Sequence, residues 1–335
     1  MKILLTGGTG FLGRRVATRL AREHEVRLLV RPGPPRAGLP NAVEQAAGDV
    51  TDRDSLAAAM VGCDAVVHAA ALVKILAPVA EFDRVNVGGL ENVLAAAADA
   101  GVGRLLYVSS FIALGPSEHG PGGLLDEAAE PLRAGRRWIN DYERTKSLAD
   151  AAARAAITRG VPLSVVYPAV IYGPGELTEG NIVVRHILDL AHGRLPALLG
   201  RPERRWSYAY VEDVAEGIAR ALATGEPGGR YVLAGDNVTS AEFYRTVAEV
   251  GGIRVPAARM PDALATASGA LMKLGARLTR GTPKLTPDLV EIYRHDWAYD
   301  SSRAARELGY LPRSLASGLA ETFAWLRTTA EWPAR

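Results

Sequence analysis

The first thirteen residues constrain the fold of this chain more than any other stretch. Residues 1–5 have the pattern of a short buried strand and run directly into Thr6–Gly13, which reads Thr-Gly-Gly-Thr-Gly-Phe-Leu-Gly, and apolar residues then recur at helical spacing. A strand, a glycine turn and a helix start in this order predict an α/β fold with a binding site for the pyrophosphate of a dinucleotide. The residues expected to bind the cofactor here are Gly7, Thr9, Gly10, Phe11, Leu12 and Gly13.

Each of the three spaced glycines has its own expected role. Gly7 permits the turn, Gly10 lets backbone N–H groups approach the phosphates, and Gly13 lets the helix pack closely on the strand. The start of that helix also favours negative charge. The spacing Gly-x-x-Gly-x-x-Gly differs from the commoner Gly-x-Gly-x-x-Gly and is the form found in short-chain dehydrogenases/reductases.

Composition narrows the class of protein. The 335 residues predict one large α/β unit with a smaller appendage, and a net charge of +2 gives no basic field that favours nucleic acid. Cys63 is the only cysteine, so neither a disulfide nor a cysteine-based metal site forms within one chain, and no metal is expected. Because the first strand follows Lys2 at once, we expect no signal peptide, and no apolar run reaches the roughly 18 residues that span a bilayer. We therefore expect a cytoplasmic monomer or homodimer without an integral membrane segment, which acts on a small molecule.

The adenosine end of the cofactor is expected beside the second strand, residues 26–30. NAD-dependent chains usually place an acidic residue there, but this strand is followed by Arg31, with Arg36 nearby. A guanidinium group binds a 2′-phosphate well, so NADP(H) is favoured and NAD(H) stays open. The alternative is that Arg31 is simply a solvated loop residue. Beyond the third strand, residues 43–47, Asp49 is placed to bind the adenine amino group beside Val50, and Asp52 has the pattern of a helix N-cap.

The fourth strand, residues 65–68, ends in three alanines whose small side chains let the backbone pass under the cofactor. These are Ala69, Ala70 and Ala71. His68 is expected to pack or hydrogen-bond locally, rather than act as a catalytic base. Asn86 is expected either to meet the cofactor or to tie two strands together.

The catalytic candidates follow the fifth strand, residues 104–108, which delivers Ser109 and Ser110 to the edge of the sheet where α/β proteins place their chemistry. Tyr142 and Lys146 come next and are four residues apart, so on a helix they share one face. A phenol with a pKa of about 10 is a poor acid at neutral pH, and a nearby ammonium group is expected to lower that pKa. Lysine occurs only five times in this arginine-rich chain, which suggests that Lys146 has a specific task.

At these residues the chain resembles the extended short-chain dehydrogenase/reductase family, within its dihydroflavonol 4-reductase-like and NAD-dependent epimerase/dehydratase group. The motifs that carry the resemblance are residues 6–13, 48–50, 68–70, 109–110, 142–146, 167–175, 210–215 and 307–310. The resemblance implies that Ser110 acts with Tyr142, that residues from Pro168 to Val170 contact the nicotinamide, and that Arg31 matches an arginine of NADPH-dependent reductases.

The expected fold is a Rossmann-type doubly wound parallel sheet with a smaller, mainly helical substrate-binding domain. Residues 1–170 are assigned to the dinucleotide-binding domain, to which 211–235 return, and 171–210 with 236–335 mostly to the substrate domain. Helices are expected from residue 180 to 191, from 211 to 223, over much of 239–293, and twice within 301–326. The segment 263–278 is apolar but holds Lys273 and Arg277, and a helix docked on its own protein is favoured over one at a membrane surface.

The expected reaction is reversible hydride transfer between a nicotinamide and a ketone or secondary alcohol, with Tyr142 as proton donor, Ser110 bound to the same oxygen and Lys146 assisting the phenol. A nucleotide-sugar epimerase is the alternative, because Arg201, Arg204 and Arg205 could hold a diphosphate, and a non-catalytic NADPH-binding protein is a further one. A 4,6-dehydratase is disfavoured, because apolar residues follow Ser110 where that group carries carboxylates.

A largely apolar and aromatic cleft is expected, suited to a hydrophobic cyclic or aromatic substrate. The residues predicted to line it or to contact the substrate are Leu72, Val73, Ile75, Phe111, Ile112, Trp138, Ile139, Tyr172, Asn181, Trp206 and Tyr208.

Overall fold

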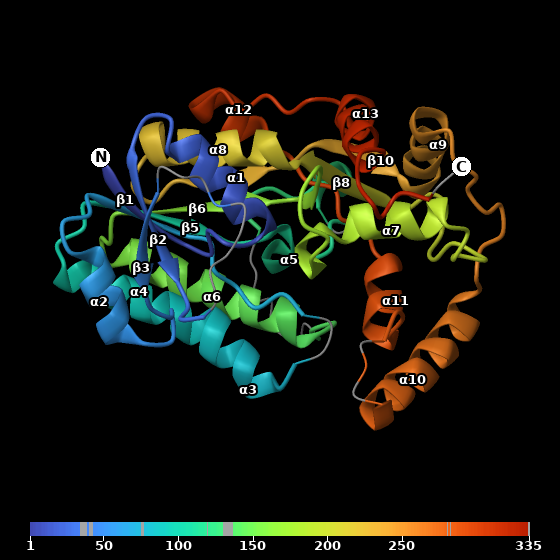
Figure 1. Ribbon diagram of the computed structural model, residues 1–335, viewed down its shortest axis with the longest axis horizontal. Helices are drawn as coiled ribbons and strands as arrows, with labels where there is room; N and C mark the ends of the chain where they lie inside the picture. The colour runs from blue at the N-terminus through green and yellow to red at the C-terminus, as the bar shows by residue number, and fades with distance from the viewer. Residues whose placement is uncertain are drawn as a thin grey trace.

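The structure is a computed structural model, shown in Figure 1. It describes residues 1–33, 39, 43–74, 77–118, 120–129, 137–279, 281 and 283–333, without the side chains of residues 121 and 277. Ile75 and Arg36 therefore lie outside the described residues.

A parallel sheet forms the centre of the larger part of the molecule. Within the described residues it has seven strands in the order β3-β2-β1-β4-β5-β6-β9. Their bounds are β1 Lys2–Thr6, β2 Glu25–Val30, β3 Val43–Ala47, β4 Ala65–His68, β5 Arg104–Val108, β6 Leu163–Pro168 and β9 Arg230–Leu233. The chain winds outward from β1 to β3 and then returns to place β4 on the other side of β1. This reversal is the point where open α/β sheets bind their ligands, and the predicted doubly wound parallel sheet is confirmed.

Helices cover both faces of this sheet (Figure 1). On one face α1 packs on α8, and α12 packs on α8 and β9; on the other, α2, α4 and α6 lie side by side. Their bounds are α1 Phe11–Leu20, α2 Arg53–Met60, α4 Gly88–Asp99, α6 Asp141–Thr158, α8 Val211–Thr224 and α12 Ser302–Leu308. Asp52 caps α2 by accepting hydrogen bonds from the N–H groups of residues 54 and 55, as its position predicts.

Short helical segments connect these layers. Their bounds are α3 Val79–Phe82, the π-helix η1 Asp83–Val87, α5 Phe111–Leu114 and the 3-10 helix η2 Pro121–Gly123. The helical segments α3, η1 and α4 follow one another without a gap in the sequence.

The smaller part of the molecule contains a second sheet, with strand order β10-β8-β7, beside its helices. The strands are β7 Val170–Tyr172, β8 Arg205–Tyr210 and β10 Asp236–Thr239, and the helices are η3 Glu179–Asn181, α7 Ile182–Ala191, α9 Ser240–Gly251, α10 Asp262–Thr279, α11 Pro287–Tyr293 and α13 Leu315–Leu326. A separate apolar core joins β7, β8, α7, α9 and α13. The predicted helices are present, and the sheet that accompanies them was not predicted.

Two helices stand apart from this second core. The α10 and α11 hairpin projects from the smaller part, at the lower right of Figure 1. Among the described residues no helix has the length and apolar character needed to cross a bilayer.

Candidate active site

The glycine turn joins β1 to α1 at the reversal point of the sheet. Gly7 has a φ of +74°, and a Cβ built there would lie 2.6 Å from the backbone of Ala69, at the end of β4. A Cβ on Gly13 would overlap the carbonyl oxygen of Gly7. Glycine is needed at both positions because the backbone passes this close, which agrees with the roles predicted for them.

The start of α1 has the character of an anion site. Gly10 is its N-cap residue and provides no side-chain cap, and the first turn holds no acidic residue. Free N–H groups and the positive end of the helix dipole there favour a phosphate group. Thr9 and Leu12 belong to the same turn, while the Phe11 ring is buried beside Gly175.

The alanine segment lies across the turn. The N–H of Ala69 donates to the Thr6 carbonyl oxygen and the N–H of Ala70 donates to the Thr6 hydroxyl, both at 3.2 Å, and Ala71 follows. The Thr6 hydroxyl oxygen also lies 2.8 Å from Nδ1 of His68. Burial lowers the pKa of His68 to about 3, helped by the charge of Lys146. The local role predicted for His68 is confirmed.

The predicted adenosine end lies at the ends of β2 and β3. Arg31 is exposed directly after β2. Asp49 accepts hydrogen bonds from the N–H and the hydroxyl of Thr51, both at 2.8 Å, and Val50 is buried against Gly89. The exposed guanidinium group of Arg31 and the start of α1 fit the negative charge of a dinucleotide.

Asn86 is held by protein groups. Its amide oxygen accepts from the N–H of Leu72 at 2.7 Å, and its amide nitrogen donates to the Thr145 hydroxyl at 3.0 Å and to the Leu72 carbonyl. Of the two predicted roles, the structural one is seen, although Asn86 ties the segment after β4 to α6 and does not tie two strands together.

The three catalytic candidates lie at the ends of β5 and α6. Ser110 follows β5 and caps α5, and Tyr142 and Lys146 lie one turn apart on α6. Ser109 is buried beside Ser110, while Pro168 and Val170 stand at the end of the neighbouring strand β6 and the start of β7. Asn140 caps α6 by accepting from the N–H of Glu143 at 2.8 Å, which fixes where the helix begins.

Burial governs the proton affinities of Tyr142 and Lys146. It raises the pKa of Tyr142 to about 12, and a hydrogen bond with Ser110 acts in the opposite direction. Lys146 lies with its ammonium group 3.3 Å from the Val108 carbonyl oxygen and 3.5 Å from the Tyr107 hydroxyl. The expectation that Lys146 lowers the Tyr142 pKa is therefore not met in this structure.

Lys146 has a second electrostatic neighbour that we did not predict. Burial lowers its pKa to about 8, and the charge of Asp150 raises it. Asp150 is fully buried and accepts hydrogen bonds from the Tyr167 hydroxyl at 2.6 Å and from Arg154 at 2.7 Å. Asp150 follows Lys146 by four residues on the same helix, and this spacing in the sequence could have predicted their interaction.

The predicted substrate residues separate into two groups. Phe111 and Trp206 keep part of their surface and pack around Trp297, whereas Tyr172, Asn181 and Tyr208 are buried in the smaller part. The Tyr172 hydroxyl donates to the carbonyl oxygen of residue 315 at 3.3 Å, the Asn181 amide donates to the carbonyl oxygen of residue 173 at 3.0 Å, and the Tyr208 ring stacks on that of residue 243. These three side chains are packed in the protein core and have little or no exposed surface of their own.

The remaining predicted lining residues differ in exposure. Ile112 is buried in α5, Val73 is exposed, and Leu72, Trp138 and Ile139 are intermediate.

An aromatic row extends from Ser110 into the smaller part. The Phe111 ring meets Trp297 edge to face at 5.6 Å, Trp297 meets Trp206 at 6.4 Å, and Trp206 stacks on Tyr293 at 5.0 Å. Trp297 and Tyr293 were not predicted, because their approach to Phe111 depends on contacts between distant segments. We call Phe111, Trp206, Tyr293 and Trp297 the aromatic wall.

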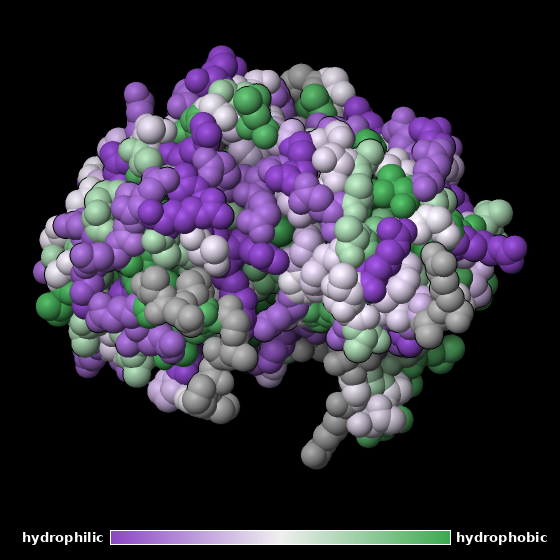
Figure 2. All heavy atoms as spheres, turned by 45° about the horizontal axis from the view of Figure 1, so that its top comes forward, coloured by the Kyte–Doolittle hydropathy of each residue, from purple (hydrophilic) through white to green (hydrophobic). Residues whose placement is uncertain are grey.

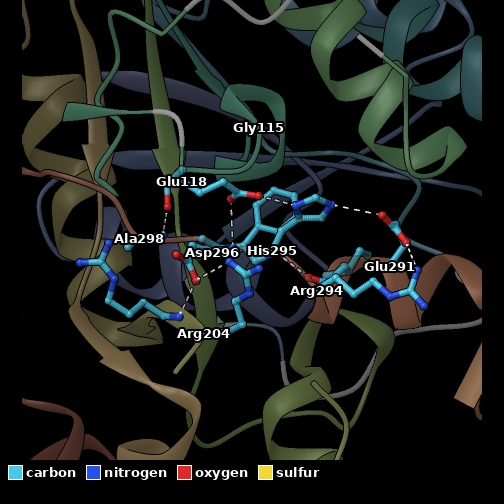
Figure 3. A network of polar contacts seen from close by, with 12 residues as sticks. Gly115, Glu118, Arg204, Glu291, Arg294, His295, Asp296 and Ala298 are labelled. Atoms are coloured by element: carbon cyan, nitrogen blue, oxygen red, sulfur yellow. Dashed lines mark hydrogen bonds and ion pairs between the residues drawn. The ribbon is translucent and has the colours of Figure 1, made fainter. Parts of the chain in front are cut away.

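A polar network holds the segment after α5 against the end of α11 (Figure 3). Nδ1 of His295 lies 2.5 Å from a Glu118 carboxylate oxygen, and Nε2 lies 3.3 Å from Glu291. These hydrogen bonds raise the pKa of His295. The other Glu118 oxygen accepts from the N–H of Asp296 at 3.1 Å, and Arg204 pairs with the Asp296 carboxylate at 3.7 Å. The network therefore fixes the aromatic wall relative to Ser110.

Comparison with known proteins agrees with this geometry. The family model "NAD dependent epimerase/dehydratase family" matches residues 3–234. Sterol demethylase protein B of Methylococcus capsulatus is 33% identical, over 98% of each chain, and 3 beta-hydroxysteroid dehydrogenase/Delta 5-->4-isomerase of Mycobacterium tuberculosis is 31% identical, over 93% of this chain and 86% of that protein.

A solved structure shows the same architecture with a cofactor in place. DesIV, a dTDP-glucose 4,6-dehydratase of Streptomyces venezuelae with NAD bound, superposes with a TM-score of 0.76 at 25% identity, over 99% of this chain and 98% of its own. The family match over most of the chain, together with relatives above 30% identity along its length, shows that the chain belongs to the NAD-dependent epimerase/dehydratase family of enzymes.

Proposed function

We propose that this enzyme uses NADPH to reduce the ketone group of a hydrophobic, ring-containing substrate, or catalyses the reverse oxidation. The observation that carries the proposal is the position of the aromatic wall, which begins at Phe111, directly after Ser110. Trp297 is buried, and the partly exposed rings of Phe111, Trp206 and Tyr293 would hold an apolar substrate near the proton donor.

The chain's own groups would act on the carbonyl oxygen. When bound, the nicotinamide supplies the hydride for reduction. Tyr142 donates its phenolic proton to the oxygen, and Ser110 donates a hydrogen bond to the same atom. Because burial raises the Tyr142 pKa to about 12, the phenol is protonated at neutral pH, and this is the form needed to reduce a ketone. Lys146 provides a positive charge close to this centre.

The apolar character of the wall supports the substrate class. A sugar ring against aromatic side chains would leave hydroxyl groups without partners, and each buried unpaired polar group destabilises the complex by about 1 to 3 kcal/mol. The two relatives named above are described as acting in sterol and steroid chemistry. A flat, largely apolar alcohol or ketone suits the wall better than a nucleotide sugar.

The preference for NADPH depends on Arg31. It is exposed at the end of β2, where an acidic residue would favour NAD, and its guanidinium group can bind a 2′-phosphate. Replacing Arg31 with Ala should weaken NADPH binding by about 10- to 100-fold and leave NADH binding unchanged. Fluorescence titration of both cofactors tests this, and equal affinities in the native protein would refute it.

The epimerase alternative is weakened by the contacts of the arginines near β8. Arg204 pairs with Asp296 at 3.7 Å, and Arg205 donates to the Gly123 carbonyl oxygen at 3.0 Å. These groups already serve the protein's own network, which makes them poor candidates for holding a diphosphate. A non-catalytic role is disfavoured because Tyr142 and Lys146 are both kept.

A substrate screen distinguishes these functions. The protein is incubated with NADPH and either hydrophobic cyclic ketones or UDP-sugars, following the loss of nicotinamide absorbance and, separately, the isomer composition of the sugars. We expect turnover of one or more ketones. Conversion of UDP-sugars with no response to any ketone would overturn the reductase proposal in favour of the epimerase.

A further inference from the structure

Helix α10 presents a leucine-rich face to solvent. Leu271 is 71% exposed and Leu278 is 81% exposed, and Leu264, Met272 and Leu274 are also exposed. At 3.6 residues per turn, the four leucines fall on one side of the helix. About 200° of the helix circumference, centred on these leucines, holds no charged residue. Figure 2 shows green, apolar atoms on the part that projects at the lower right, where Figure 1 places α10. We call this surface the leucine face.

The opposite side of α10 is already occupied. Ala265 is buried, a Cβ on Gly269 would lie 2.8 Å from the backbone of Thr286, and Lys273 pairs with Asp288 at 3.0 Å. The helix is therefore docked on its own protein, as expected from the sequence, but only through this inner side. Its packing on α11 turns the leucine face outward.

The α10 and α11 hairpin is held in a defined position relative to the candidate active site. Tyr293, the last residue of α11, stacks on Trp206 of the aromatic wall. His295 links Glu291 of α11 to Glu118, which follows the catalytic segment (Figure 3). The leucine face and the aromatic wall thus belong to one connected structure.

The residues that flank the leucine face argue against a second copy of α10 as its partner. The exposed leucines and Ala267 repeat at intervals of three and four, which is the spacing of a coiled-coil seam. In a coiled coil the positions beside the seam usually carry charges that pair between helices. Here these positions are small residues, apart from Arg277, and they are Ala263, Ser268, Ala270 and Gly275. The apolar arc is also wider than a two-helix seam covers.

Charge complementarity favours an anionic lipid surface. The sequence of residues 273–284 holds four basic residues, Lys273, Arg277, Arg280 and Lys284, and no acidic one. Of these, Lys273 pairs with Asp288 on the inner side of α10, and Lys284 is exposed. A broad apolar helix face next to a basic stretch of sequence is the pattern of a helix that lies in the interface of a bilayer. We propose that α10 docks this enzyme on the surface of a bilayer that contains anionic phospholipid. Docking would leave the body of the protein in water and bring the aromatic wall close to molecules dissolved in the lipid.

Vesicle co-sedimentation of the full chain tests the proposal. Phosphatidylcholine vesicles are compared with vesicles that also contain phosphatidylglycerol. We expect binding to the anionic vesicles that weakens as salt is added. The double variant L271S/L274S should bind at least about tenfold more weakly, and Lys284→Glu should weaken binding to the anionic vesicles alone. Leu311→Ser is the matched control, because Leu311 is 84% exposed but lies between α12 and α13.

The readouts separate this proposal from its rivals. Near-ultraviolet circular dichroism and thermal melting check that each variant is folded. Absence of binding to both vesicle types, or equal binding by L271S/L274S, would overturn the proposal. A dimer of the native protein in analytical ultracentrifugation that L271S/L274S does not form, together with no binding to vesicles, would also overturn the proposal. A second copy of the chain would then cover the leucine face. Sedimentation needs no substrate, so failure of the proposed reaction leaves this test unaffected.

Discussion

The Phe111 ring meets the Trp297 ring edge to face, with the centroids 5.6 Å apart, although the two residues are 186 positions apart in the chain. Phe111 follows Ser110, and Trp297 pairs with β8 through backbone hydrogen bonds to residues 205 and 207. This contact joins the segment that carries Ser110 in the larger part to the aromatic residues of the smaller part. Under the proposed function, both parts therefore contribute to substrate preference.

Truncation of the aromatic wall should weaken substrate binding more than chemistry. Replacing Trp206 with Ala removes a partly exposed ring that stacks on Tyr293 and that we place against the substrate. We expect KM for a hydrophobic ketone to rise by about tenfold or more, with kcat less affected. Trp325→Ala is the control, because Trp325 packs on the separate core of α9 and α13. Equal KM values in the two variants would contradict the assignment.

Removal of the Tyr142 hydroxyl tests the proton donor. Tyr142→Phe keeps the ring and its packing but leaves no proton to donate. Turnover should fall by about two to four orders of magnitude. Affinity for NADPH, measured by fluorescence titration, should be largely retained. A variant that turns over at the native rate would show that Tyr142 is not the acid.

The charge on Asp150 should affect the pH dependence of the reaction through Lys146. Burial lowers the Lys146 pKa to about 8, and Asp150 opposes this, so Lys146 is cationic below that pH and neutral above it. In Asp150→Asn the Lys146 pKa should fall further. The loss of activity on the alkaline side should then begin at lower pH.

Full pH profiles of kcat/KM measure this shift. Asp189→Asn is the control, because Asp189 lies on α7 and pairs with Arg194. An unchanged alkaline limb in Asp150→Asn would show that Asp150 acts only through the hydrogen bonds from Tyr167 and Arg154.

The network around His295 should make stability depend on pH. Hydrogen bonds from His295 to Glu118 and Glu291 raise its folded-state pKa above 6.5. The folded state therefore binds this proton more tightly than the unfolded state does. The resulting stabilisation of the folded protein is fully present below about pH 6.5, the ordinary pKa of histidine, and is lost as the pH rises through the folded-state pKa. Thermal melting between about pH 6 and pH 9 should show this decline in the native protein and a flatter profile in His295→Gln. Glu118→Gln should flatten it as well, and parallel profiles in all three proteins would rule the network out as the cause.

The sequence alone was enough to predict the glycine turn, the doubly wound sheet and the positions of Ser110, Tyr142 and Lys146. Each depends on a pattern within a short stretch, such as the alternation of strand, turn and helix or a four-residue spacing on one helix. Local backbone preferences and burial periodicity act over these distances. The pattern therefore determines where the residues lie.

Tertiary structure decided the features that depend on distant contacts. It buried Tyr172, Asn181 and Tyr208 in a core that their local sequence does not reveal. It brought Trp297 to Phe111, placed Lys146 beside Tyr107, and used one side of α10 for packing while leaving its leucines exposed. The physical reason is that burial and the pKa of a side chain depend on which segments fold against it, and no local pattern specifies that partner.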